Sequence, residues 1–204
     1  MHDKNWSLFD YDPHTNKWKV LATGVHVDDG TTAAIDPANN LFVVVGAGGT
    51  HSNTSFPSVP KYHTLQVFSL SGLGKTQTWN NSGCDLTFRS GGLAWDSALG
   101  LMVGYPGGGN QVYLLNTGPK DMVTPFGTVP SHRCLDVAIS TKPSPVKGVD
   151  YPPDTEGTGR EGNLGVYGRF AYFPSLDIFA LVNDRGRNAW ILRLSDKTDK
   201  KTAP

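Results

Sequence analysis

The stretch GLAWDSALGLMVGYPGGG (residues 92–109) decides the fold, because the chain repeats its pattern twice more without a gap. The other copies are TAAIDPANNLFVVVGAGG (32–49) and RFAYFPSLDIFALVNDRG (169–186). In each copy a short turn, DPANN, DSALG or PSLD, separates two apolar runs. Asp, Pro, Ser and Asn are typical of tight turns, and the second run is almost continuously apolar, as in a strand covered on both faces. The pattern therefore predicts three β-hairpins.

A third strand is predicted after each hairpin, in the segments HTLQVFSL (63–70), NQVYLLN (110–116) and NAWILRL (188–194). After the first two of these strands the chain turns and reaches an aromatic residue, Trp79 or Phe126, which places a fourth strand on the outside of the unit. The segment LFDYDPHTNKW near the N-terminus carries the third and fourth strands of a further unit. No helical period appears over any long window, so the sequence predicts an all-β chain of four-stranded antiparallel units.

These units resemble the kelch and galactose-oxidase-like group of β-propellers. The resemblance is carried by the apolar strands, the glycine pairs Gly48-Gly49 and Gly108-Gly109, the aromatic Tyr113 in the third strand, and the late Trp79. It covers most of the chain except residues 131–165. It implies a β-propeller-like fold of four-stranded blades but says almost nothing about activity, because propellers serve as binding proteins and enzymes alike.

The number of predicted strands bears on how the ring is completed. A single domain, residues 1–204, contains blade units at roughly 5–24, 30–80, 89–130 and 166–196, with a long rim loop at 131–165. That is about three and a half blades, whereas a closed ring needs at least about four. An open sheet edge of this apolar character would aggregate. We therefore expect an incomplete ring that is closed by homo-oligomerisation or that forms part of a longer propeller.

The charge balance and the cysteines restrict the partners and the compartment. Lys plus Arg and Asp plus Glu both number 18, so the formal net charge is zero and gives no electrostatic footprint for nucleic acid or an anionic membrane surface. No apolar run resembles a signal peptide or a spanning helix, which predicts a soluble chain of unknown compartment. Cys84 and Cys134 either form one disulfide or remain two buried thiols, and the sequence leaves both alternatives open.

The longest predicted loops converge on one rim of the blades, because they connect strand two to strand three or one blade to the next. Long loops in a compact domain often carry function, and arginine suits bidentate contacts with carboxylate or phosphate. Arg89 and Arg169 each precede a first strand, which should bring them near the central channel. We expect this rim to bind a carbohydrate, a small anionic ligand or a protein through Arg89, Arg169, His51, His63, Arg133, Tyr151 and Arg160.

The alternative function is a calcium-dependent hydrolase similar to the propeller lactonases, so whether the chain is an enzyme stays open. Calcium would need hard oxygen ligands from several blades. The candidate ligands are Asp28, Asp85, Asn183 and Asp184, and the candidates for a general base are His132 and His51. No other cofactor is indicated, because the sequence has no P-loop, dinucleotide fingerprint, H-E-x-x-H motif or serine elbow.

Overall fold

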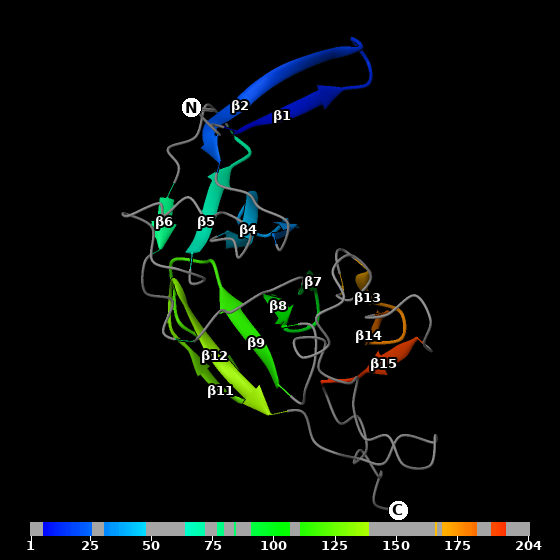
Figure 1. Cartoon of the computed structure of the whole chain (residues 1–204). Helices are drawn as coiled ribbons and strands as arrows, with labels where there is room; N and C mark the ends of the chain where they lie inside the picture. Colours follow the sequence, from blue (N-terminus) through cyan, green and yellow to red (C-terminus); the bar gives the residue numbers. More distant parts are fainter. Residues whose placement is uncertain are drawn as a thin grey trace, which may run out of the picture.

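The computed structural model describes residues 6–25, 31–47, 64–71, 77–79, 84, 91–106, 111–138, 166, 169–182 and 189–194. Throughout these residues the secondary structure consists of strands and turns, without a helix. The strands form several antiparallel sheets, which follow one another along the chain (Figure 1). The predicted all-β class is therefore confirmed.

The strands group into three larger sheets and two hairpins. The N-terminal hairpin consists of β1 (Trp6–Asp12) and β2 (Lys17–Val25). The first sheet has the order β3 (Thr32–Asp36), β4 (Leu41–Ala47), β5 (Thr64–Ser69) and β6 (Gln77–Trp79). The second sheet has the order β7 (Gly92–Asp96), β8 (Leu101–Tyr105), β9 (Gln111–Asn116) and β12 (Arg133–Ala138). The third sheet contains β13 (Phe170–Phe173), β14 (Ile178–Leu181) and β15 (Trp190–Leu192), and the short accessory hairpin contains β10 (Met122–Thr124) and β11 (Gly127–Val129).

Strand register confirms the repeat that the sequence predicts. The same two alignment columns pair across the hairpin in all three sheets, as Ile35 with Phe42, Trp95 with Met102, and Tyr172 with Phe179. A third strand then pairs with the second strand in each sheet. Trp79 lies on β6, the outer strand of the first sheet, where the sequence predicts it.

An aspartate at the start of the turn explains why the hairpins share one geometry. The Oδ1 atom of Asp36 accepts hydrogen bonds from the amides of Ala38 and Asn39, at 2.9 and 3.1 Å. Asp12 and Asp96 accept bonds from the amides two and three residues further on in the same way. Four residues after the aspartate, a residue with positive φ completes the turn, a conformation that Asn and Gly tolerate. The residues at this position are Asn16, Asn40 and Gly100; in the third sheet Phe173 takes the place of the aspartate, and Asp177 has the positive φ.

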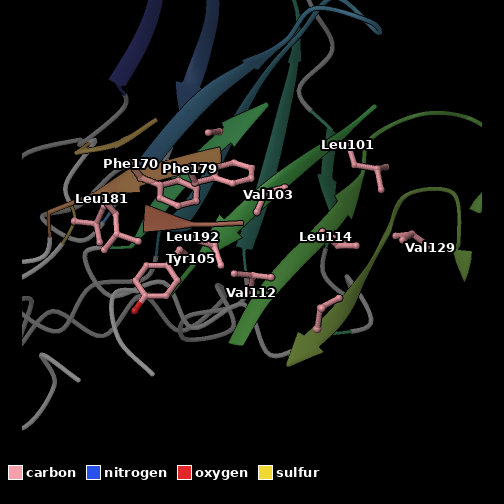
Figure 2. Packing of buried hydrophobic residues seen from close by; sticks show 13 residues of the cluster. Leu101, Val103, Tyr105, Val112, Leu114, Val129, Phe170, Phe179, Leu181 and Leu192 are labelled. Atoms are coloured by element: carbon pink, nitrogen blue, oxygen red, sulfur yellow. The ribbon is translucent and has the colours of Figure 1, made fainter. Parts of the chain in front are cut away.

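The sheets pack face to face in chain order. One apolar cluster joins the N-terminal hairpin to the first sheet, a second joins the first sheet to the second, and a third joins the second sheet to the third. Figure 2 shows the third cluster, in which Phe170 and Phe179 of the third sheet lie beside Val103 of the second. The rings of Phe170 and Phe179 stack with their centroids 5.0 Å apart. The core is therefore divided into layers between successive sheets.

The first strands β3, β7 and β13 lie side by side, so that β7 contacts both of the others. Gly92, the first residue of β7, permits the close approach of β13. A Cβ at this position would overlap the Cβ of Phe170 and would lie 2.9 Å from Cγ1 of Val166. A side chain here would therefore push the second and third sheets apart at one end.

The outer strand of the second sheet differs from the prediction. The sequence analysis placed a fourth strand near Phe126 and a loop over residues 131–165, but β12 occupies Arg133–Ala138 and pairs with β9. The segment around Phe126 forms the accessory hairpin instead. The buried Asn116 side chain holds this hairpin, because its Nδ2 donates to the carbonyl oxygens of Lys120 and Val129 at 2.7 and 3.0 Å. The loop predicted over 131–165 therefore does not include Arg133–Ala138, and the hydrogen bonds of Asn116 cannot be read from local turn signals.

Candidate functional site

The two ends of the sheets differ in character. At one end, which we call the turn end, Asp36 accepts a hydrogen bond from the Oγ1 atom of Thr117, a residue that directly follows β9 of the second sheet. At the same end of the next pair of sheets, Tyr172 of β13 lies in hydrogen-bonding contact with Asp96 of β7. These contacts require β3, β7 and β13 to run in the same direction. Their first residues therefore share the opposite end, which we call the loop end.

Arg169 lies at the loop end, directly before β13, as the sequence predicts. Its backbone is fixed on both sides, because its amide donates to the oxygen of Val166 at 2.7 Å and its carbonyl accepts from Val182 at 3.0 Å. Its side chain is exposed, and Nε donates to the same Val166 oxygen at 3.2 Å. The side chain of Arg169 is therefore held at the start of β13 in an exposed residue.

His132 and Arg133 lie at the turn end, which corrects their predicted position on the rim of Arg169. Arg133 begins β12 and pairs with Asn116, the last residue of β9. His132 adopts a positive φ of 57° in the turn before β12. Because β12 is the fourth strand of the second sheet, this turn belongs to the connection between strands three and four. Such a connection lies at the same end as the aspartate turns, so the structure separates these two residues from Arg169.

The remaining candidates lie outside the described residues. They are the ligand-binding candidates Arg89, His51, His63, Tyr151 and Arg160, and the calcium candidates Asp28, Asp85, Asn183 and Asp184. Within the part of the chain that the structure describes, no three His, Cys, Asp or Glu residues gather as metal ligands would. Among the described residues, Arg169 is thus the ligand-binding candidate that lies at the loop end.

Buried polar contacts between sheets are a feature that the sequence analysis missed. Asp36 is fully buried, and its Oδ2 accepts hydrogen bonds both from Thr117 of the second sheet and from Asn39 Nδ2, the latter at 2.7 Å. Asp96 occupies the equivalent position in the second sheet and is also buried. The repeated aspartate of DPANN and DSALG is the sequence signal for these contacts. Each aspartate therefore stabilises its own turn, and Asp36 in addition binds the neighbouring sheet.

The contact between the second and third sheets involves two carboxylates and one phenol. The Tyr172 hydroxyl donates to Oδ1 of Asp177 at 2.8 Å. Burial raises the pKa of Asp96 above its ordinary value, although bonds from the amides of Leu99 and Ala98 oppose this shift. Burial and the hydrogen bond to Asp177 raise the pKa of Tyr172. Tyr172 therefore stays protonated at neutral pH and donates its hydroxyl proton to Asp177 of its own sheet, close to Asp96 of the second sheet.

A disulfide joins Cys84 to Cys134, with a Cα–Cα distance of 5.8 Å. Cys84 lies in the connection between the first and second sheets, and Cys134 lies on β12, the outer strand of the second sheet. Both cysteines of the chain are in this bond, which decides between the two alternatives that the sequence left open. The disulfide therefore ties Cys84 to the outer strand of the second sheet.

Comparisons with known proteins give no family for this chain. The sequence matches no protein-family model and no curated protein. Among the described residues, no helix has the length and apolar character needed to cross a membrane.

Proposed function

We propose that the chain is a β-propeller-type recognition module that binds an anionic ligand at its loop end. The propeller arrangement is supported by the packing of successive sheets in chain order and by the contacts of β7 with β3 and β13. In a propeller the first strands of neighbouring blades lie next to one another around the centre. A ligand at their shared end would contact several blades at once.

The proposal of an anionic ligand rests on the position of Arg169. Arg169 is exposed at the start of β13, and its side chain is oriented by the bond from Nε to Val166. Arginine presents its donors in a planar fork that matches a carboxylate or a phosphate. The whole chain has a formal net charge of zero, so its net charge does not attract an anionic ligand. A carboxylate on a sugar or on another small molecule is the ligand chemistry that this arrangement favours.

Replacement of Arg169 by alanine is expected to weaken binding of an acidic oligosaccharide by about tenfold to a hundredfold, which corresponds to loss of charge-assisted hydrogen bonds. A panel of neutral and uronic-acid-containing oligosaccharides would first identify the probe, and calorimetric titration would then measure affinity. Arg169→Lys should retain only part of the affinity, because an ammonium group cannot form the bidentate contact.

Arg193→Ala is the matched control for this experiment. Arg193 is also exposed and follows β15, but it lies at the turn end, where Nη2 donates to the carbonyl of Leu176 at 3.5 Å. Its replacement should leave affinity unchanged. Equal affinities of Arg169→Ala and the wild type would remove Arg169 from the site, and failure of every acidic probe to bind would contradict the proposed ligand class. Stabilisation by calcium during the same measurements would favour the hydrolase alternative instead.

A further inference from the structure

The stack of sheets leaves two apolar faces without a covering sheet. The first and second sheets are covered on both sides by their neighbours in the stack. The N-terminal hairpin is covered by the first sheet on one face, and the third sheet is covered by the second sheet on one face. These two elements are the first and the last of the stack (Figure 1).

The open face of the N-terminal hairpin is strongly aromatic. Phe9 pairs with Val20 and Tyr11 pairs with Trp18, so these four side chains share one face of the ribbon, and all four are exposed. Trp18 has 69% of its surface exposed, and its ring lies 4.8 Å from that of Tyr11. A two-stranded hairpin is only marginally stable alone, and an aromatic face of this kind marks an interaction site. We call these four residues the hairpin face.

The open face of the third sheet is also apolar. Ala180 pairs with Ala171 on one side and with Ile191 on the other, and Phe173 pairs with Ile178, which places all five residues on the same face. Ile191 has 72% of its surface exposed, and Phe173 is exposed as well. The other face of this sheet carries Phe170 and Phe179, which belong to the core. We call this open surface the third-sheet face.

We propose that the hairpin face of one chain packs against the third-sheet face of a second copy, head to tail. The two faces belong to the first and the last element of the stack, so their contact lies between two molecules. The contact would repeat the interface type that the chain already forms three times between its own sheets. A formal net charge of zero removes electrostatic repulsion between copies. This proposal is independent of the ligand proposed for the loop end.

A head-to-tail contact is heterologous, because the two chains contribute different surfaces. This property makes the proposal testable by complementation. Trp18→Lys damages only the hairpin face, and Ile191→Lys damages only the third-sheet face. Each variant alone should lose self-association, with a dissociation constant raised by about tenfold or more. An equimolar mixture should recover a heterodimer, because the intact third-sheet face of the first variant can bind the intact hairpin face of the second.

Sedimentation velocity and light scattering over a concentration series would measure these states, with the full chain in its disulfide-bonded form. Val123→Lys is the matched control, since Val123 is 84% exposed on β10 and lies on neither face; this variant should associate like the wild type. Val20→Lys offers a second hairpin-face variant, and circular dichroism would verify that every variant is folded. If the wild type remains monomeric at all concentrations, the proposal is overturned, and the two faces would then bind a different protein. Unchanged association of both lysine variants, or a mixture that does not recover the heterodimer, also overturns it.

Discussion

Reduction of the disulfide between Cys84 and Cys134 is expected to lower the free energy of unfolding by about 2–4 kcal/mol. The bond closes a loop with a sequence separation of 50 residues, and closing a loop of this length removes much of the conformational freedom of the unfolded chain. In the folded state it also holds the connection before β7 against β12. Thermal or urea denaturation of the oxidised and reduced protein would measure the difference.

The double variant Cys84→Ser, Cys134→Ser is the control for the disulfide experiment. It should be as unstable as the reduced wild type, and addition of reductant should not change its stability further. Thiol titration of the unfolded, unreduced wild type should find no free thiol. Equal melting temperatures with and without reductant would contradict the expected stabilisation. Because disulfides persist in oxidising environments, the protein for this comparison must be prepared under oxidising conditions.

The hairpins could be predicted from the sequence because their information is local. In DPANN and DSALG, the aspartate that binds the turn amides and the residue with positive φ are within five residues of each other. The alternation of apolar runs around these turns then determines which residues pair, as with Trp95 and Met102. Short-range chemistry of this kind is visible in a single sequence.

The outer strand of the second sheet could not be predicted in the same way. Two segments after β9 were available as the fourth strand, and the choice depends on hydrogen bonds from Asn116 to Lys120 and Val129. The buried residues Cys134 and Val137 are three positions apart, so they do not give the period of two that marks a half-buried strand. The same error misplaced His132 and Arg133. The prediction put them after the fourth strand, at the loop end, whereas they lie before the fourth strand β12, at the turn end. Arg169 lies directly before the first strand β13, a position that follows from the local sequence alone.

Contacts between sheets are the information that the sequence analysis lacked. The pairing of Asp36 with Thr117 joins residues 81 positions apart, and neither residue type predicts the other. The pairing of Cys84 with Cys134 likewise required the three-dimensional arrangement. The repeat nevertheless indicates where such contacts arise, because Asp36 and Asp96 occupy one column of the alignment and are both buried. The aspartate at this position of the repeat therefore contacts a different residue of the neighbouring sheet in each case, Thr117 for Asp36 and Tyr172 for Asp96.

Replacement of Asp36 by alanine is expected to lower the free energy of unfolding by about 2–4 kcal/mol, since it removes both a turn cap and a buried hydrogen bond between sheets. The amides of Ala38 and Asn39 lose their common acceptor, but they lie in an exposed turn where water can replace it. Thr117 is buried, so its hydroxyl group loses a partner that water does not readily replace. Chemical denaturation would measure the change.

Asp12→Ala is the matched control, because Asp12 accepts hydrogen bonds from its own turn, at His14 and Thr15, in an exposed environment. Asp12→Ala should lower the free energy of unfolding clearly less than Asp36→Ala does. The contribution between sheets can be isolated with Thr117→Val, which removes the hydroxyl group at nearly constant volume. In a double-mutant cycle, Asp36 and Thr117 should show a coupling energy of about 1–3 kcal/mol. Additive effects of the two substitutions, or equal losses from Asp12→Ala and Asp36→Ala, would show that Asp36 acts only within its own turn.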